Sequence, residues 1–540
     1  AIVLASYAGS VRSGTVWDDE FLTTRNPNFD SWRGLLRLLT TDIWMSSAKQ
    51  EPSGYYRPLV SLSFAFNRWL LGNAPSAYHM GNITIHAMVT IALFEVLRRA
   101  ARLPKVSAVL VAALFATAPL ASEPVLWISG RYDSLGTFFA LLALLAHGSR
   151  RRRALAPIAY LAAVFCKEPF ILVPFFLVAY DLLLDRKPLR QRWFSYAALG
   201  AAAVAYLVLR ALVHVPSPGR LLEQGPRALV EAYAFSLGTF AKLAIFPRGL
   251  SPFRTYEQPI GADVVAILLA AFTTLVAILL WQRRSRRRAA SAALFGLLWC
   301  LVAMGPGSST ATTLRIIGDR YAYFPLVGTS IALSALFLLG PRWRRAASIG
   351  VLVAVAAQAV ALRAHVSEWR TADALYQAML RDDPGNFTAL TLLGTAQAQR
   401  GELVQAEASL LRARRTAPIT WRIDVGLCFV YLREARLGEA EASCRAAVAS
   451  NPNDPRAWLN LASVQLNGGA WEGATASASR AIALKPAYAE AYFVRAAAFS
   501  KLGRDGDARR DVGEALRLAP QHAGARQLRR ELAPAAAAPP

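Results

Sequence analysis

Residues 321–339 read YAYFPLVGTSIALSALFLL, an uncharged and mostly apolar run that is long enough to cross a bilayer as a helix. Similar runs lie at 262–281 and 346–362, and others precede them, whereas the last third of the chain has none. We therefore expect an all-α protein, in which a polytopic membrane domain at residues 1–365 is followed by a soluble tail.

Clusters of arginine and lysine separate the apolar runs, and the positive-inside rule places these clusters in the cytoplasm. They lie at residues 98–105, 150–153, 186–192, 283–288 and 342–345. The first loop at 11–78, the turns at 123–133 and 167–168, and the segment 307–320 then face the outside. About eleven spans satisfy this alternation if the apolar run at 228–246, within the segment 214–261, is a re-entrant or interfacial helix.

Charge and cysteine usage exclude several classes of protein. Most of the formal net charge of +25 lies between the apolar runs, as topology determinants do, so we predict no nucleic-acid partner. The four cysteines have no CxxC spacing, and we expect neither a disulfide framework nor a zinc site. The first apolar run after Ala1 is short, so we expect that an upstream part of that span is missing and assign no signal peptide.

The soluble tail carries an internal repeat of 34 residues, which is the period of tetratricopeptide repeats. It is marked by Pro384, Pro418, Pro452, Pro486 and Pro520. Small residues recur in register as Ala406, Ala440, Ala474 and Ala508, and again as Ala413, Ala447, Ala481 and Ala515. We expect a repeat superhelix at 366–522, with four full repeats and a partial one at 368–383, and then a capping helix and a disordered Ala/Pro tail at 523–540. The concave groove of such a superhelix commonly accepts an extended peptide.

Three consecutive carboxylates, Asp18, Asp19 and Glu20, lie between aromatic residues in the first outer loop, in the stretch VWDDEF. At the mouth of a membrane cavity such a carboxylate is partly desolvated, holds a raised pKa and can accept a proton from a nucleophile. The alternative interpretation is a solvated acidic turn.

The other outer loops combine cations, acids and aromatic rings at the ends of the spans. The cations Arg57, Arg131, Lys167 and Arg320, on a common face, would suit the phosphate of a lipid. Their neighbours Glu123, Trp127, Asp133, Glu168, Asp319 and Tyr321 are expected to support them. In the alternative interpretation, Trp127 belongs to an interfacial aromatic belt and Arg131 pairs with Asp133.

The sequence offers little for metal or nucleotide chemistry. His79 and His86 are seven residues apart on one helical face, and packing is the favoured role over metal ligation. The chain contains no HExxH, no GxSxG and no glycine-rich nucleotide loop after a strand. We therefore predict no resident metal site, although the second carboxylate of the acidic motif could bind a divalent cation or position Arg57.

An ordered set of motifs resembles a known family. It consists of WDDEF with a nearby NP, YYRPLVSLSFAFN, YHMGNITIHA, SEPVLWISGRYDSL, CKEPFILVPF and GDRYAYFPLVG, followed by the repeats. In this order they are similar to the transmembrane and tetratricopeptide repeat-containing O-mannosyltransferases, which are membrane-embedded glycosyltransferases of the GT-C type. The resemblance implies a polyprenyl-phosphate-linked sugar donor and a protein hydroxyl acceptor. One departure is residues 118–123, APLASE, where the family has an HPxHxE stretch.

The expected reaction is transfer of a sugar, mannose by resemblance, to Ser or Thr hydroxyls of proteins outside the cytoplasm. Asp18 or Asp19 would take the hydroxyl proton, the cations would neutralise the departing lipid phosphate, and the repeat groove would guide the acceptor. The Ala/Arg-rich composition is typical of a bacterium with GC-rich DNA, so the outer side is expected to be the periplasm.

Three alternatives stay open at this stage. The chain could be a non-catalytic membrane-anchored scaffold whose repeats assemble secreted or envelope proteins. It could transfer another lipid-linked glycan. It could also transport lipid-linked sugars, although the charges at the ends of the spans count against this interpretation.

Overall fold

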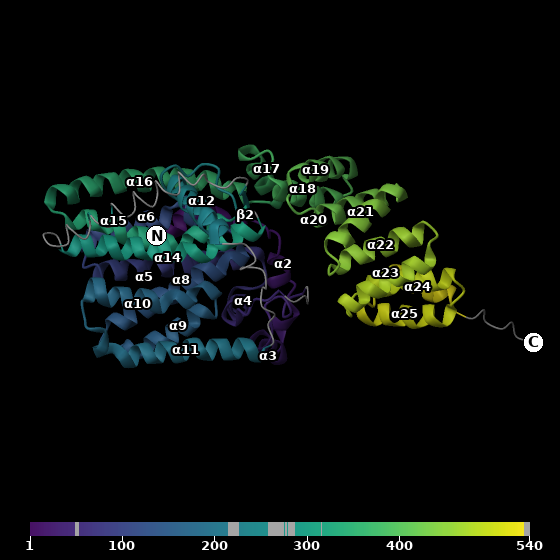
Figure 1. Cartoon of the computed structure of the whole chain (residues 1–540), viewed down its shortest axis with the longest axis horizontal. Helices are drawn as coiled ribbons and strands as arrows, with labels where there is room; N and C mark the ends of the chain where they lie inside the picture. The colour runs from purple at the N-terminus through teal and green to yellow at the C-terminus, as the bar shows by residue number, and fades with distance from the viewer. Residues whose placement is uncertain are drawn as a thin grey trace, which may run out of the picture. The chain divides into compact units, whose positions relative to one another are not determined.

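The structure is a computed structural model that describes residues 1–48, 53–213, 226–256, 287–314 and 316–533, together with Leu275 and Ile278. The described chain divides into two compact units, Ala1–Ala378 and Met379–Pro540. Figure 1 shows that both are built from helices. The boundary falls inside helix α17, Ala372–Asp382, a short distance after the predicted end of the membrane domain at residue 365.

The first unit contains helices of very different length. Its short or medium helices are α1 Ile2–Tyr7, α2 Asp19–Leu22, α3 Trp32–Thr40, α4 Pro58–Leu71, α6 Lys105–Thr117, α7 Glu123–Leu126, α9 Ala156–Val164, α10 Val173–Tyr180 and α15 Tyr323–Ser334. Its longer helices are α5 Pro75–Arg99, α8 Arg131–Gly148, α11 Trp193–Leu212, α12 Pro226–Ile245, α14 Arg287–Leu314 and α16 Pro341–Glu368. A short antiparallel ribbon joins β1, Arg254–Thr255, to β2, Ile316–Ile317.

Among the described residues, six helical segments are long and apolar enough to cross a membrane. They are Pro75–Arg99, Leu189–Leu212, Arg227–Ile245, Arg287–Ser308, Asp319–Leu338 and Pro341–Glu368. Two shorter apolar helices, Lys105–Thr117 and Arg153–Val164, lie between them in the chain. The helical membrane protein is thus confirmed, while the count of about eleven spans stays a prediction.

Two predictions about the spans need comment. The run at 228–246, which we expected to be re-entrant or interfacial, forms the regular helix α12, whose length permits a full crossing. The expected span at 262–281 and most of the basic cluster at 283–288 lie outside the described residues, as do parts of the segment 214–261.

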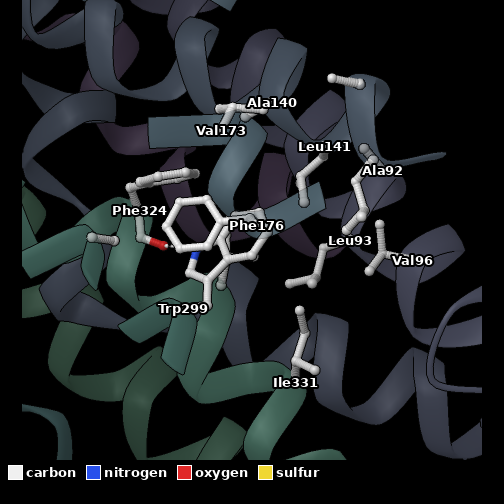
Figure 2. Close-up of a cluster of buried hydrophobic side chains, with 14 of the residues drawn as sticks. Ala92, Leu93, Val96, Ala140, Leu141, Val173, Phe176, Trp299, Phe324 and Ile331 are labelled. Atoms are coloured by element: carbon white, nitrogen blue, oxygen red, sulfur yellow. Dashed lines mark hydrogen bonds between the residues drawn. The ribbon is translucent and has the colours of Figure 1, made fainter. Parts of the chain in front are cut away.

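The core of the first unit is aromatic where α14 and α15 meet α10 (Figure 2). The Trp299 ring stacks on Phe176 with centroids 4.3 Å apart, and its indole Nε1 donates a hydrogen bond of 3.1 Å to the Phe324 carbonyl oxygen. The backbones of α14 and α15 approach closely at Gly296 and Gly328. A Cβ on Gly296 would lie 2.4 Å from the Gly328 carbonyl oxygen, so only glycine fits there.

The predicted outer loops gather at one end of the long helices. Figure 1 shows α2, α3, α4 and β2 at the same end of α5, α8 and α14. Buried residues of the first loop pack with residues of α4, α5 and α8 there, among them Leu22, Phe64, Tyr78 and Leu135. Segments that are far apart in sequence are thereby brought to one region, where a site can form.

The second unit is a series of antiparallel helix pairs followed by one more helix. The pairs are α18 Phe387–Gln399 with α19 Leu403–Thr416, α20 Trp421–Arg433 with α21 Leu437–Ser450, α22 Pro455–Asn467 with α23 Trp471–Leu484, and α24 Ala489–Lys501 with α25 Asp505–Leu518; α26 is Ala523–Glu531. All eight alanines of the repeat are fully buried. Small side chains there let paired helices approach, as the repeat register requires. Residues 534–540 of the predicted tail lie outside the described residues.

One expectation about the second unit was wrong. We expected no disulfide framework, but Cys428 of α20 and Cys444 of α21 form a disulfide, with Cα atoms 5.2 Å apart. Both residues are fully buried between the two helices of a single repeat. Their separation of 16 residues reflects the return of the chain along the second helix and has no local spacing signature.

Candidate active site

The acidic motif is held in place by aromatic packing around Trp17. This residue has φ of +49°, in the left-handed region that side chains other than glycine seldom adopt. Its ring makes edge-on contacts with Trp127, Phe253 and Trp369, at centroid distances of 5.4, 4.8 and 5.7 Å. Strained backbone of this kind persists only where packing enforces it, and it concentrates at functional sites.

Asp19 is the first residue of α2 and is fully buried. Its Oδ1 accepts hydrogen bonds from the Ser129 backbone nitrogen at 2.9 Å and from Ser129 Oγ at 2.6 Å, and its Oδ2 accepts one from the Val16 nitrogen at 3.0 Å. Burial raises the pKa of Asp19 to about 7, against the opposing effect of these three hydrogen bonds. A carboxyl group with this pKa can exchange a proton near neutral pH.

The other two carboxylates of the motif have different surroundings. Asp18 is partly buried and directly precedes α2, without a side-chain hydrogen bond that caps the helix. Glu20 lies nearer the surface, where it forms an ion pair of 2.8 Å with Arg25. Of the three acids, Asp19 is the one that is fully buried.

Three of the predicted cations meet around two tyrosine rings. Arg57 Cζ and Lys167 Nζ lie 4.8 and 4.7 Å from the centroid of the Tyr132 ring. Lys167 Nζ and Arg320 Cζ each lie 4.9 Å from the centroid of the Tyr321 ring. These five residues, which we call the cation–tyrosine cluster, come from four separate segments of the chain.

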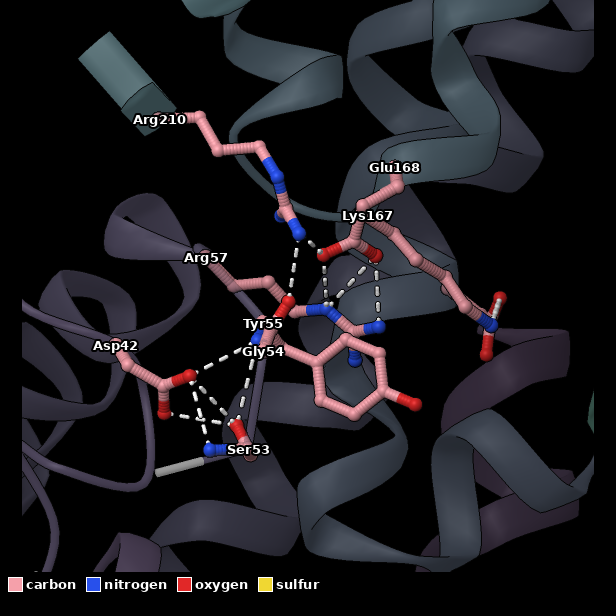
Figure 3. Close-up of polar contacts among 9 residues, drawn as sticks. Asp42, Ser53, Gly54, Tyr55, Arg57, Lys167, Glu168 and Arg210 are labelled. Carbon is pink, nitrogen blue, oxygen red and sulfur yellow. Dashed lines mark hydrogen bonds and ion pairs between the residues drawn. The ribbon is translucent and has the colours of Figure 1, made fainter. Parts of the chain in front are cut away.

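Each cation of the cluster has a carboxylate partner. Arg57 Nη2 lies 2.8 Å from Glu168 Oε2 (Figure 3), and Lys167 Nζ lies 2.6 Å from Asp133 Oδ1. Arg320 donates to Glu123 from its side chain, at 2.6 Å, and from its backbone nitrogen, at 2.7 Å. Burial raises the pKa of Glu123, although the Arg320 charge opposes this shift.

The loop that carries Arg57 is fixed by a second polar network (Figure 3). The Asp42 carboxylate accepts hydrogen bonds from Ser53 Oγ at 2.7 Å and from the Tyr55 nitrogen at 2.9 Å. Arg210 Nη2 donates to the Gly54 carbonyl oxygen at 2.8 Å. These contacts hold the Tyr55 ring 4.4 Å from the Arg57 guanidinium carbon.

Asp319 and Trp127 border the cluster. Asp319 accepts hydrogen bonds from the Ser251 nitrogen at 2.6 Å and from Arg254 Nη2 at 3.2 Å, so it joins the segment before β1 to the one that carries Arg320. The Trp127 ring lies under Arg320, with 5.3 Å between its centroid and the guanidinium carbon.

Arg131 is not part of the cation–tyrosine cluster. Its side chain is buried, and it donates to Asn82 Oδ1 at 2.6 Å, to Asn67 Oδ1 at 2.7 Å and to the carbonyl oxygens of Ser63 and Tyr78. Oxygen atoms of the protein accept hydrogen bonds from these donors. Contrary to the prediction, Arg131 therefore does not share a face with Arg57 and Arg320. It does not pair with Asp133 either, because that carboxylate binds Lys167. Arg131 instead joins α4, α5 and α8.

Sequence reasoning assigned no role to Ser129, Tyr132, Asn67 or Asn82. The two asparagines are polar residues in apolar helices, and a buried arginine needs polar partners. Their positions in the sequence could therefore have indicated that they bind Arg131. Ser129 and Tyr132 were quoted within the SGRYD motif, but only the fold shows which groups they contact.

Two hollows lie beside this region. A small, shallow polar one is lined by Pro119, Ser122, Glu123, Ser251, Pro252, Asp319, His365 and Trp369. A mostly apolar one, with a cavity volume of about 70 Å³, is lined by residues that include Leu114, Leu120, Leu243 and Leu333. Pro119 lines both, so the apolar hollow borders the polar one.

The described part of the chain holds no group of three or more His, Cys, Asp or Glu side chains that could bind a metal ion. His86 contacts the Tyr323 hydroxyl at 2.7 Å and the Ala116 carbonyl oxygen at 3.2 Å, and His79 contacts the Gly14 carbonyl oxygen at 3.3 Å. Both rings are buried and have partners in the protein.

Comparisons with known proteins agree with the motif resemblance. The human protein O-mannosyl-transferase TMTC3 is 29% identical over 225 residues, which are 39% of this chain and 24% of the human protein. Tmtc1 of Drosophila melanogaster is 33% identical over 179 residues, covering 32% of this chain and 21% of the relative. The Caenorhabditis elegans O-mannosyl-transferase F38B6.6 is 22% identical over 442 residues, or 77% of this chain and 62% of that protein. The matches to TMTC3 and Tmtc1 thus span about a quarter or less of those relatives.

No protein-family model matches the chain. Among solved structures, the TPR protein YrrB covers 29% of this chain and 81% of its own, with 19% identity and a TM-score of 0.26. These comparisons confirm the resemblance carried by the ordered motifs: the chain is similar to the transmembrane and tetratricopeptide repeat-containing protein O-mannosyl-transferases.

Proposed function

We propose that this chain is a membrane-embedded glycosyltransferase of the GT-C type that moves a sugar, mannose by resemblance, from a polyprenyl-phosphate donor to Ser or Thr hydroxyls of proteins outside the cytoplasm. One observation carries the proposal: four motifs from distant parts of the chain meet in a single cluster. Tyr132 lies against Arg57 and Lys167, and Tyr321 lies against Lys167 and Arg320. Asp19 is bonded to Ser129, three residues before Tyr132. Relatives that are similar to part of this chain are named protein O-mannosyl-transferases.

In this proposal Asp19 is the general base. The acceptor hydroxyl oxygen attacks the anomeric carbon of the donor, and its proton passes to the Asp19 carboxylate. The bond between the anomeric carbon and the phosphate oxygen breaks, and its electron pair leaves with the polyprenyl phosphate. An ionised carboxylate has about four acceptor positions, and three hydrogen bonds occupy Asp19, which leaves one for the incoming proton. Asp18 is the nearest alternative base.

The cations Arg57, Lys167 and Arg320 are proposed to stabilise the phosphate as its charge develops. Their carboxylate partners keep the unloaded cluster near neutrality, and their remaining N–H groups can turn to phosphate oxygens. A phosphate leaves readily without protonation, so a second carboxyl group acting as general acid is not required. Glycoside hydrolysis differs, because there an acid must protonate the leaving oxygen.

The apolar hollow supports a place for the isoprenoid chain of the donor. Its lining residues come from α6, α12, α15 and α16, which are apolar helices, and it borders the polar hollow that contains Glu123 and Asp319. The apolar lining matches the isoprenoid chain in chemistry.

The Cys428–Cys444 disulfide supports the proposed location of the repeat unit. Disulfides persist in oxidising compartments such as the periplasm or the lumen of the secretory pathway and are rare in the cytosol. We therefore propose that the repeats act outside the cytoplasm, on the side of the active site, and that their groove binds the acceptor peptide. In a bacterium, the membrane would be the inner one.

The proposal is tested by sugar transfer in proteoliposomes. The full chain receives a synthetic polyprenyl-phosphate mannose and a Ser/Thr-rich peptide, and mannosylated peptide is measured by mass spectrometry. Asp19→Asn should reduce the rate by about 10²–10⁴-fold, the usual contribution of a general base. Glu95→Gln is the matched control, because Glu95 pairs with Arg99 near the last turn of α5 and has no part in the site. Equal rates for the wild type and Asp19→Asn would reject the assignment, and no transfer by the wild type would favour the scaffold alternative.

A further inference from the structure

Residues 365–376 lead from the candidate span that ends at Glu368 into helix α17, and we call this segment the brace. The repeat period assigned most of it to a partial repeat. The brace belongs to the first unit, and its two large rings, Trp369 and Tyr376, are buried, at 1% and 4% exposure. A segment that only connected two units would not need to bury two aromatic side chains, so their packing indicates a further role.

The brace contacts the chain just before the acidic motif. The Gly14 backbone nitrogen donates a hydrogen bond of 3.1 Å to the Arg370 carbonyl oxygen. The Trp369 ring lies edge-on against the Trp17 ring, with 5.7 Å between their centroids. Both Gly14 and Trp17 lie shortly before Asp19 in the sequence, so the brace holds the segment that leads into the candidate base.

Trp369 is itself held in one orientation by a chain of polar contacts. Its indole Nε1 donates to His365 Nε2 at 3.1 Å, and His365 Nδ1 lies 2.8 Å from Glu368 Oε2. An indole nitrogen can only donate, so Nε2 of His365 accepts, and the imidazole carries a proton on Nδ1 that it donates to Glu368. These contacts leave the indole little freedom to turn away from Trp17.

A second contact comes from the first turns of α17. Burial raises the pKa of the Tyr376 hydroxyl, and the charges of Asp373 and Asp18 act in the same direction. The effect of a charge falls with distance, so the Tyr376 hydroxyl lies near the Asp18 carboxylate. The brace therefore reaches the acidic motif from α17 as well as from Trp369.

The backbone of Trp17 explains why the motif needs such support. Its φ of +49° is unfavourable for a residue with a side chain, and conformations of this kind persist only where the surroundings enforce them. The nitrogen of the preceding residue, Val16, donates to Asp19 Oδ2 at 3.0 Å. If Trp17 relaxed to a common backbone conformation, this hydrogen bond and the start of α2 would shift. The packing that holds the Trp17 ring thus also sets the position of Asp19.

We propose that the brace holds the acidic motif in its working conformation, and that Trp369 and His365 are positioning residues for Asp19. Neither residue needs to touch the substrate, because both act through Trp17. Helix α17 continues into the second unit, so the segment that carries the repeats is also the one that supports the candidate base. The effect on catalysis rests on the proposed function, whereas the effect on the conformation of the motif does not.

The conformational effect is tested by hydrogen–deuterium exchange of the full chain in lipid nanodiscs, measured by mass spectrometry. Trp369→Leu removes the ring, and His365→Ala removes the acceptor that orients it. Trp369→Phe is the conservative variant, because it keeps a ring against Trp17. Trp458→Leu is the matched control: its indole also donates a hydrogen bond, to the Pro452 carbonyl oxygen, but lies in the repeat unit.

Amides of residues 14–23 should exchange about tenfold faster or more in Trp369→Leu and His365→Ala, since the strain at Trp17 then favours opening. Trp369→Phe should keep most of the protection, and α15 should exchange as in the wild type in every variant. Unchanged exchange of residues 14–23 in Trp369→Leu and His365→Ala would overturn the proposal. Faster exchange throughout the first unit in both variants would assign the two residues a general folding role and would overturn it as well.

The catalytic effect is measured by sugar transfer in proteoliposomes. A loosened motif exposes Asp19 to water and removes the burial that raises its pKa, so the rate of Trp369→Leu should increase with pH below about 7. Its kcat should fall by up to about 10²-fold, as for a misplaced reactive group, with a much smaller change in KM for the lipid donor.

Faster exchange of residues 14–23 with an unchanged kcat and pH profile would show that the brace does not position Asp19, and would overturn that role. No transfer by the wild type would count against the proposed function instead. The exchange of residues 14–23 alone would then support or overturn the brace.

Discussion

At the scale of single residues, one neighbour, Ser129, makes most of the hydrogen bonds to the candidate base Asp19. Ser129 supplies two of the three hydrogen bonds to the Asp19 carboxylate, one from its backbone and one from its hydroxyl. Hydrogen bonds to a carboxylate favour its charged form, and these two partly offset the effect of burial on the Asp19 pKa. The hydroxyl of Ser129 is thus expected to keep Asp19 usable near neutral pH.

Ser129→Ala removes the hydroxyl donor and leaves the backbone donor in place. The pKa of Asp19 should rise above about 7, so the rate of sugar transfer should increase with pH at a higher pH than in the wild type. The measurement is the pH–rate profile of each protein, with Ser236→Ala as the control because Ser236 is also buried and its hydroxyl donates to the Ala232 carbonyl oxygen within α12, away from Asp19. Superimposable profiles for the wild type and Ser129→Ala would show that the hydroxyl does not tune Asp19.

At the scale of elements, the close approach of α14 and α15 depends on glycine. Gly296→Ala would place a methyl group 2.3 Å from the Ala332 nitrogen, so the helices must separate and the aromatic core at Trp299 must repack. Overpacking of this kind costs about 1–3 kcal/mol. Thermal unfolding in detergent should show a lower midpoint for Gly296→Ala. Gly350→Ala, on an open face of α16, should leave the midpoint unchanged. Equal midpoints for the two variants would argue against this helix contact.

In the repeat unit, the Cys428–Cys444 disulfide joins the two helices of one repeat. Closing a loop of this length stabilises a fold by about 3 kcal/mol in the chain-entropy treatment, so replacing both Cys428 and Cys444 by Ser should lower the unfolding midpoint of the repeats. Alkylation of the denatured chain reports the bond directly. Without reductant, two cysteines should react, and with reductant, four should react. Four reactive cysteines in both samples, from cells with an oxidising outer compartment, would contradict the disulfide.

The sequence predicted those elements that local periodicity encodes. Apolar length and the 34-residue spacing depend only on neighbouring residues, so the membrane helices and the repeat pairs were foreseeable. The partners of Arg131 and of Cys428 were not, because each is set by a contact between helices. The cation–tyrosine cluster was foreseeable as a group of outer-side cations, but the sequence did not separate Arg131 from Arg57, Lys167 and Arg320.

At the scale of the whole molecule, the proposal requires the site and the repeats to face the same compartment. In intact cells, a cysteine at Val404 should react with a membrane-impermeant thiol reagent. A cysteine at Arg151, in a basic cluster assigned to the cytoplasm, should react only after the membrane is opened. The reverse pattern, or reaction of both cysteines in intact cells, would contradict the assigned topology and the idea that the repeats deliver an acceptor to the site.

The central claim is that a buried Asp19 accepts the proton of the acceptor hydroxyl while lipid-linked mannose is transferred. The most direct measurement is the rate of transfer as a function of pH for the wild type and Asp19→Asn. A base with a raised pKa is protonated and inactive below that value, so the wild-type rate should increase through pH about 7 and level off above it. Asp19→Asn should lose this increase, together with about 10²–10⁴-fold in rate. An identical profile and rate in both proteins would contradict the claim.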